Sequence, residues 1–308
     1  MLPSMHRVFI LLTLITILLS LSGCRSGVLP TPWPTPVADV AEKETLTAAT
    51  ATPQPAATLG AALSSPAITD PRPKQSPVPG VAPALPPIEP ALVTHGDRSR
   101  PYIALTFDAC QTVGSPTGYD QAIIRILNGT HTPATLFLGG LWMQQHPAQT
   151  QALATNPLFE LGNHSWSHLD FTELSPEEVS REILRTQDIM VQLTGRQPTL
   201  FRFPFDTYTD DALAAVGQHG LRAIQADVIT GDADPRITTR DIVNSVTAKT
   251  QNGSIIIMHM NTHGWHTAEA LPPLIQRLRD QGYTFVTVSQ LLGLAPLPTP
   301  VADPDRTP

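Results

Sequence analysis

The sequence has little of several features that would restrict it to particular classes of protein. Its 308 residues include only two cysteines, Cys24 and Cys110, which cannot build an internal disulfide framework. The net charge is −7, and no cluster of lysine and arginine provides the basic surface that phosphate backbones require. No internal repeat indicates a solenoid. We therefore expect a monomer with one globular domain, stabilised by its buried core, and no nucleic-acid partner.

Residues 1–24 are typical of an export signal. A weakly basic start precedes the apolar run Val8–Leu19, and the small residues Leu21-Ser22-Gly23 lead to Cys24. The apolar run is shorter than the roughly 20 residues that a membrane-spanning helix needs. The Leu-Ser-Gly-Cys site resembles the lipobox of bacterial lipoproteins. We expect a lipoprotein signal peptide at 1–23, lipidation of Cys24 and anchoring to the membrane at the cell envelope. The alternative is an ordinary cleaved signal with an incidental cysteine.

Two segments are rich in proline, threonine and alanine and show no hydrophobic period. Residues 24–93 contain runs such as TPWPTPVAD and DPRPKQSPVPGVAPALPP, and residues 295–308 repeat this composition. Such segments cannot bury enough apolar surface to fold, and proline extends them. We expect a disordered linker at 24–93, a folded domain at 94–294 and a disordered tail at 295–308.

Apolar runs of strand length alternate with helical patterns inside the folded domain. Most runs are continuously apolar, as in strands buried on both faces of a parallel sheet. The seven predicted strands are Tyr102–Phe107, Ala134–Leu138, Leu158–Gly162, Thr199–Phe203, Arg222–Asp227, Ser254–Met258 and Tyr283–Val288. A capping-box pattern at Ser175 and Glu178 predicts a helix that ends at Gly195, and Thr209 starts another that ends at Gly220. The repeated order of strand and helix predicts an α/β fold, a parallel (β/α)7 barrel.

Polar residues follow several strands at their carboxyl ends, where the loops of a parallel barrel form a cleft. They are Asp108, Asn163, His164, His168, Arg202, Asp232 and His259. His164 and His168 are four residues apart, and on a helical turn two such imidazoles point the same way and share one divalent ion. This pattern alone belongs more often to surface or packed histidines.

Five motifs, in order across Tyr102–Leu292, resemble those of the polysaccharide deacetylase family, carbohydrate esterase family 4. They are Thr106-Phe107-Asp108, the run from Asn163 to His168, Arg202-Phe203-Pro204-Phe205, a looser match at Asp227–Asp232, and Ile256-Ile257-Met258-His259. The resemblance implies the distorted (β/α)7 barrel of this family and a metal-dependent hydrolase.

The resemblance also implies a role for each site residue. His164 and His168 hold a divalent metal, with Zn²⁺ as the expected ion, which activates a water and polarises an acetamide carbonyl. The remaining roles are Asp108 as base oriented by Arg202, the backbone N–H of Phe205 as oxyanion donor, and His259 as acid with Asp232 beside it.

Each of these residues has a structural alternative when taken alone. Asp108 can be a turn or cap residue, and Arg202 can cover an apolar strand end. His259 can be a hydrogen-bonded core histidine, and Asp232 can form a turn. The order of the motifs and their places at strand ends favour the catalytic roles.

The match departs from the family pattern at Ala109, where the family has an aspartate that is its third metal ligand, and at Ala233, where it has tryptophan. Two imidazoles alone bind a divalent ion less tightly, so a water, Asp108 itself or another side chain must complete the site. Asp120 is one candidate, although it is a more natural helix start. Cys110 is another, either as a soft thiolate or as a small buried residue.

Aromatic and histidine side chains also occur in the loop after His259. Trp265 either lines the cleft for sugar or is a partly exposed loop aromatic, and His263 and His266 receive no role. The substrate expected from the resemblance is the N-acetyl group of N-acetylglucosamine or N-acetylmuramic acid in a surface polysaccharide, peptidoglycan before xylan or chitin. The alternatives are a glycan-binding wall lipoprotein with weakened catalysis and an amidase for small N-acyl compounds, which would need a closed pocket.

Overall fold

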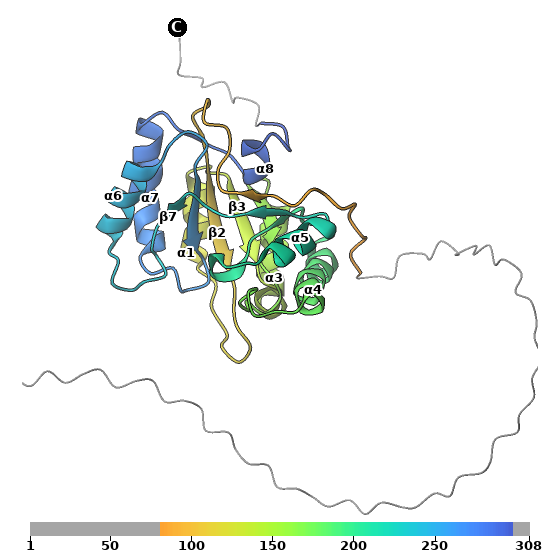
Figure 1. Cartoon of the computed structure of the whole chain (residues 1–308). Coiled ribbons are helices and arrows are strands. Elements are labelled where there is room, and N and C mark those ends of the chain that lie inside the picture. Colours follow the sequence, from red (N-terminus) through yellow and green to blue (C-terminus); the bar gives the residue numbers. More distant parts are fainter. Residues whose placement is uncertain (1–80, 298–308) are drawn as a thin grey trace, which may run out of the picture. The chain divides into compact units, whose positions relative to one another are not determined.

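Strand β2 (Tyr102–Ala109) runs through the middle of a parallel sheet in this computed structural model, which describes residues 81–297 (Figure 1). The other strands are β1 (Leu92–Val93), β3 (Ala134–Leu138), β4 (Phe159–Asn163), β5 (Leu200–Phe201), β6 (Arg222–Ile224), β7 (Val228–Ile229), β8 (Ile255–His259) and β9 (Thr284–Phe285). Their order is β1-β6-β5-β4-β3-β2-β8-β7, with β9 beside β2. Because β1 and β7 end this path, the sheet is an open barrel, and the expected distorted α/β barrel is confirmed.

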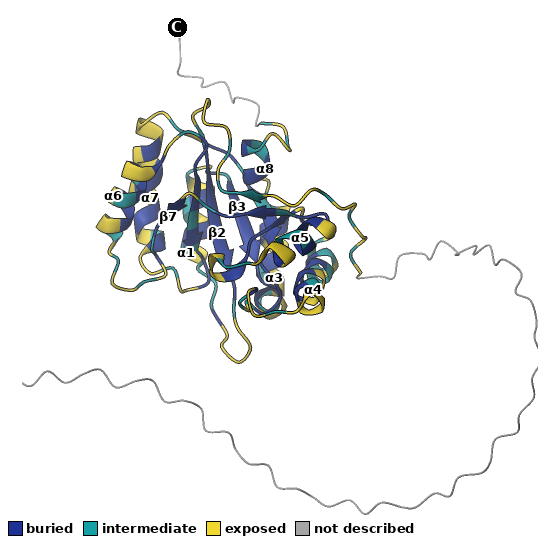
Figure 2. Ribbon diagram, in the orientation of Figure 1, coloured by how far each residue is buried: buried dark blue, intermediate teal, exposed yellow. Residues whose placement is uncertain are grey.

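Helices cover the outside of the sheet, as Figures 1 and 2 show. They are α1 (Gln121–Gly129), α2 (Gly140–Gln145), α3 (Pro147–Thr155), α4 (Pro176–Thr194), α5 (Asp210–Gln218), α6 (Thr239–Lys249), α7 (Thr267–Asp280) and α8 (Val288–Leu291), with a short 3-10 helix at Pro204–Asp206. Buried residues concentrate in the strands and on the inner helix faces, whereas the outer helix faces are exposed (Figure 2). None of the helices in residues 81–297 has the length and apolar character that spanning a bilayer requires.

The side chains of β2 alternate between the two faces of the sheet, as the geometry of a strand requires. Ile103, Leu105, Phe107 and Ala109 belong to the hydrophobic core that also includes residues of α1 and α7. Ala104 belongs to a different core cluster. Asp108 therefore faces away from the core under α1 and α7, towards the inside of the barrel.

The predicted helix boundaries in the middle of the domain are confirmed. Ser175 caps α4 in a reciprocal capping box with Glu178, and Gly195 ends the helix with a φ of 66°. The hydroxyl of Thr209 accepts a hydrogen bond from the backbone N–H of Ala212 at 3.1 Å at the start of α5. These local patterns are determined by short-range hydrogen bonds, so the sequence is sufficient to find them.

Three predicted strands are shorter in the structure. The run expected at Arg222–Asp227 contains only β6, and β7 follows it; just before β7 the Asp227 carboxylate accepts hydrogen bonds from Ile255 N–H and Ser254 Oγ at 2.8 and 2.9 Å. The run expected at Tyr283–Val288 contains only β9, because Thr287 caps α8. The run expected at Thr199–Phe203 is reduced to β5.

The end of the expected linker, residues 81–93, lies against the domain. Ala82 N–H donates to Asp188 Oδ1 at 2.8 Å, and Ile88 N–H donates to the carbonyl of Gly217 at 2.9 Å. Leu92 and Val93 form β1, which pairs with β6. Proline-rich composition did not indicate these tertiary contacts, and the folded part begins before Thr94. The expected signal peptide, Cys24, most of the linker and most of the tail lie outside the described residues.

Candidate active site

A cavity of about 670 Å³ opens at the carboxyl ends of the strands. Its lining includes Asp108, Cys110, His164, His168, Phe205, Asp232, His259, His263 and Trp265. Arg202 is fully buried behind it and reaches the site through Asp108. All catalytic and metal-binding residues expected from the sequence therefore lie at one place, although they come from loops and strands up to 151 positions apart, as Asp108 and His259 illustrate.

Asp108 and Arg202 form a buried ion pair. Arg202 Nη1 donates to Asp108 Oδ1 at 2.8 Å, and the two side chains are 1% and 4% exposed, respectively. Burial by itself would raise the pKa of Asp108, but the charge of Arg202 holds that pKa below its ordinary value. Asp108 is therefore a carboxylate at neutral pH, as a base must be.

His164 and His168 converge from the loop after β4, with ring centroids 5.0 Å apart. His164 Nδ1 lies 3.0 Å from the carbonyl of Arg202, which leaves Nε2 free towards the cavity. Burial lowers the pKa of His164, and burial is also the main cause that lowers the pKa of His168 to about 3. Both imidazoles are thus neutral at neutral pH, which is the form that binds metals. For the same reason, the 3.6 Å approach of His164 Nε2 to Asp108 Oδ2 is not an ion pair.

The expected reason for this convergence was wrong, because residues 164–168 form no helical turn. Ser165 and His168 instead have left-handed backbone angles, with φ of 60° and 55°. Glu182 of α4 holds this loop: its carboxylate accepts hydrogen bonds from the backbone N–H groups of Trp166 and Ser167, at 2.9 and 2.8 Å, and from Ser167 Oγ at 2.8 Å. Sequence reasoning missed Glu182, although an acidic residue beside Ile183 on the apolar face of α4 was a signal.

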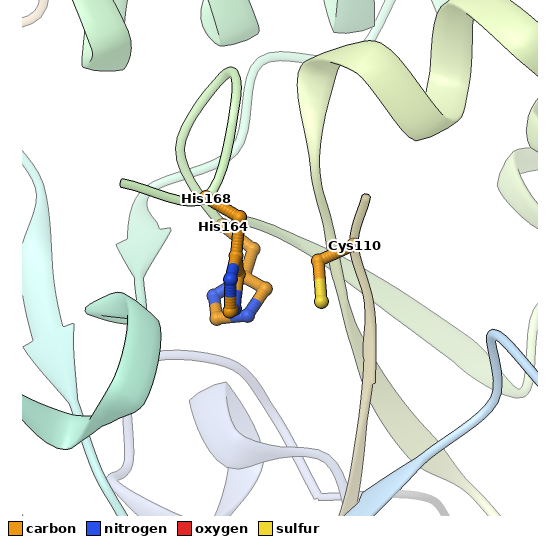
Figure 3. Close-up of side chains that lie close together, drawn as sticks. All are labelled: Cys110, His164 and His168. Atoms are coloured by element: carbon orange, nitrogen blue, oxygen red, sulfur yellow. The ribbon is translucent and has the colours of Figure 1, made fainter. Parts of the chain in front are cut away.

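Cys110 lies next to the two imidazoles. The donor atoms of Cys110, His164 and His168 are all within 4.8 Å of one another, and Figure 3 shows the thiol beside the two rings. Burial, followed by the charge of Asp108, raises the pKa of the Cys110 thiol to about 12. The other candidate, Asp120, caps α1 by accepting a hydrogen bond from Ala122 N–H at 2.8 Å. Its role as a helix start is confirmed.

Asp232 holds His259 through two hydrogen bonds. His259 Nδ1 lies 2.8 Å from Asp232 Oδ1, and His259 N–H donates to Oδ2 at 2.8 Å. Thr267, which sequence reasoning missed, also donates to Oδ2 at 2.7 Å. Burial by itself lowers the pKa of His259, but the hydrogen bond and charge of Asp232 more than offset it and raise that pKa. A protonated His259 is thereby favoured, as an acid requires.

Apolar side chains surround the opening of the cavity. Phe205, Ile229 and Trp265 line it while remaining 61%, 60% and 47% exposed. Phe205 has a φ of 56°, and its ring contacts His168 edge-on with centroids 4.5 Å apart. The backbone N–H of Trp265 donates to the carbonyl of Asp232 at 2.7 Å, which places this loop beside the His259–Asp232 pair. His263 lines the cavity, whereas His266 caps α7 beside Glu269.

The donor set fits a divalent transition metal. Two neutral imidazoles, one of them oriented by a backbone carbonyl, converge with a sulfur atom at the base of an open cavity. Nitrogen and sulfur donors of this kind suit Zn²⁺ and not the hard ions Mg²⁺ and Ca²⁺.

Comparison with known proteins gives three informative similarities. The N-acetylmuramic acid deacetylase PdaC of Bacillus subtilis is 34% identical over 200 residues, covering 63% of this chain and 39% of that protein. The peptidoglycan-N-acetylglucosamine deacetylase PgdA of Listeria monocytogenes is 31% identical over 191 residues, covering 62% and 39%. This chain thus spans about two fifths of the length of both relatives. The solved structure of PdaC is 33% identical with a TM-score of 0.54, covering 63% of this chain and 91% of that one.

A family model described as polysaccharide deacetylase matches residues 95–224, which include the carboxylate, the two histidines and the arginine of the site. The similarity to the solved structure of PdaC covers 91% of that structure, nearly its full length. On the sequence motifs, the open parallel barrel and these similarities, the chain belongs to the polysaccharide deacetylase family.

Proposed function

We propose that this protein hydrolyses the N-acetyl groups of amino sugars in a cell-wall polysaccharide, with peptidoglycan as the first candidate. One observation supports this most strongly. Asp108, paired with Arg202, and His259, paired with Asp232, are register partners on the neighbouring strands β2 and β8, and they line one cavity together with His164 and His168. A cleft that only binds a glycan needs no matched base and acid.

The residues divide the reaction between them. Asp108 accepts the proton of the attacking water, and Arg202 keeps its carboxylate charged and directed into the cavity. A bound divalent ion, held by His164 and His168, would supply Lewis-acid activation of the water and the acetamide carbonyl. His259 then transfers a proton to the amine that leaves, and Asp232 keeps its imidazole oriented. The backbone N–H of Phe205, at the edge of the cavity, is the proposed oxyanion donor.

The similarity to PdaC and PgdA supports peptidoglycan as substrate, since their names assign them to N-acetylmuramic acid and N-acetylglucosamine of that polymer. The exposed apolar side chains at the cavity opening support a polymer in preference to a small N-acyl compound, because a closed pocket would cover them.

We test the activity by measuring acetate released from purified peptidoglycan, chitin oligomers and acetylated xylan, with and without chelator. Chelation and the substitution His168→Ala should each abolish release from the true substrate. The matched control is His95→Ala, which removes an exposed imidazole outside the cavity and should leave release intact. Release that survives both treatments would contradict the metal-dependent mechanism.

We further propose that the protein is a lipoprotein of the cell envelope, anchored through Cys24. The support is the export signal and the Leu-Ser-Gly-Cys site of the sequence. Growth with a labelled fatty acid should label the full chain, and Cys24→Ala should remove the label and release the protein from membranes. Unlabelled wild-type protein would exclude the anchor.

A second candidate function is glycan binding with weakened catalysis, and Ala109 is the observation that favours it. This alternative predicts substoichiometric metal in the purified protein together with retained binding to peptidoglycan. Full metal content with acetate release would exclude it.

A further inference from the structure

The missing aspartate of the family leaves the metal site without its usual third ligand, and the structure offers a replacement one residue further along the chain. Side chains of β2 alternate between faces, and Ala109 belongs to the core cluster that contains Phe107. Cys110 follows on the face of Asp108 and, like it, lines the cavity. The side chain of Ala109, next to the proposed base Asp108, therefore points away from the histidines, whereas that of Cys110 points towards them.

The distances are suitable for one ion. Two ligands at about 2.1 and 2.3 Å from a tetrahedral Zn²⁺ lie roughly 3.6 Å apart. The donor atoms of Cys110, His164 and His168 are within 4.8 Å of one another, so a shift of about 1 Å brings them to that spacing. A cysteine needs only a χ1 rotation for such a shift. Figure 3 shows the thiol and the two rings next to one another.

The two carboxylates that the sequence offers as a third metal ligand, Asp120 and Asp108, each form a hydrogen bond with another group. Asp120 caps α1 through its hydrogen bond from Ala122 N–H. Arg202 holds Asp108 through Oδ1 at 2.8 Å, and although Asp108 Oδ2 lies 3.6 Å from His164 Nε2, Asp108 is not a member of the three-donor cluster found among the described residues. Among the described residues, Cys110 is the side chain grouped with both imidazoles in that cluster.

One neighbour of the sulfur, Asn261, would support a metal-bound thiolate. Asn261 Nδ2 lies 3.4 Å from Cys110 Sγ and 2.7 Å from the carbonyl of Cys110. By donating to the carbonyl oxygen and the sulfur of Cys110, the Asn261 amide orients the residue and stabilises negative charge on the sulfur. Groups that hydrogen-bond to metal ligands commonly have this role.

We propose that the Cys110 thiolate, with His164 and His168, completes a His₂Cys site for a borderline-soft divalent ion such as Zn²⁺ or Co²⁺. This inference deepens the proposed function and rests on the metal requirement of that function. The thiol proton passes to solvent when the ion binds. Compared with a site of two imidazoles and a carboxylate, this site should discriminate more strongly against Mg²⁺ and Mn²⁺.

The experiment uses Co²⁺ as a spectroscopic probe in the purified protein. Wild-type protein should show a thiolate-to-cobalt charge-transfer band in the near ultraviolet and release about one proton per ion at neutral pH. Cys110→Ser should lose the band and the proton and bind Co²⁺ about 100-fold more weakly or worse, since loss of a partner behind a ligand alone costs roughly 10–100-fold.

Two further variants serve as controls for the sulfur ligand. Ala109→Ser changes the neighbouring residue on the opposite face and should keep the band and the affinity. Cys110→Asp replaces the sulfur ligand by a carboxylate, so it should bind Co²⁺ more tightly than Cys110→Ser but without the band. It tests the sulfur ligand even if the serine variant is unstable.

The outcomes separate this inference from the proposed function. Wild-type protein that binds Co²⁺ without the band, or a Cys110→Ser variant with unchanged affinity, overturns the thiolate ligand even if the enzyme releases acetate. A protein with the band that releases acetate from none of the polymers keeps the His₂Cys site and overturns the deacetylase function.

Discussion

Arg202 Nη1 donates a hydrogen bond to Asp108 Oδ1 at 2.8 Å, from one fully buried side chain to another that is 4% exposed. The guanidinium also stacks over the ring of Phe137, with its carbon 4.1 Å from the ring centroid. Both charges are almost wholly buried, so each depends on the other for compensation.

Replacing Arg202 by methionine should destabilise the domain by roughly 3–5 kcal/mol at neutral pH, because a buried carboxylate is left unpaired. The pKa of Asp108 is below its ordinary value in the native protein, so this stabilisation exists at neutral pH and is lost as pH falls through that lowered pKa. Urea unfolding of the variant at several pH values should therefore show a deficit that shrinks in acid. The double variant Asp108→Asn/Arg202→Met is the control and should recover part of the loss, whereas a double variant no more stable than the single one would contradict the pairing.

Replacing Asp232 by asparagine should move the alkaline limb of the pH–rate profile to lower pH. The native hydrogen bond and charge of Asp232 raise the pKa of His259, so the protonated acid persists to higher pH than an isolated histidine would allow. Initial rates of acetate release across pH measure the shift. Asp234→Asn, which removes a nearby acid paired with Arg236, serves as control. An alkaline limb common to both variants would refute the role of Asp232.

Replacing Glu182 by glutamine should weaken metal binding by roughly 10–100-fold, because Glu182 positions the backbone of the loop between His164 and His168 without touching the ion. Isothermal titration with Zn²⁺ measures the affinity. Excess metal should restore much of the activity, which a general folding defect would prevent. Glu177→Gln, on the exposed first turn of the same helix, should bind Zn²⁺ like the wild type.

Replacing Trp265 by alanine should raise KM for polymeric substrate by about tenfold with little change in kcat, because an aromatic at the cavity edge contributes binding that is equal in ground and transition states. The effect should be smaller for a short N-acetylated oligomer that does not reach the edge. Steady-state kinetics on both substrates separate the two parameters. A fall in kcat with an unchanged KM would contradict this binding role, because the alanine variant keeps the hydrogen bond from the backbone N–H of residue 265 to the carbonyl of Asp232.

Several features of the fold follow from local sequence alone. Ser175, Glu178 and Gly195 predict the limits of α4. The capping hydrogen bonds of Ser175 and Glu178 and the positive φ of Gly195 involve only neighbours within a few positions. Continuous apolar runs likewise predict β3 and β4 to within one residue. The early end of β6 could not be predicted, because the chain after it is held by hydrogen bonds from Ser254 and Ile255, which are distant in the sequence, to the Asp227 carboxylate.

The sequence was sufficient to predict which types of group the site contains, since the motifs indicated a base, an acid and a pair of imidazoles. Only the tertiary structure decided how they meet: a loop with left-handed residues brings His164 to His168, and Glu182 holds it. The same holds for the third donor. Sequence left Asp108, Asp120, Cys110 and water open, whereas the structure shows that Asp120 caps α1 and that the Cys110 sulfur lies within 4.8 Å of both imidazoles. Residue types specify which bonds are available, but the path of the backbone in space specifies which atoms come within reach of one another.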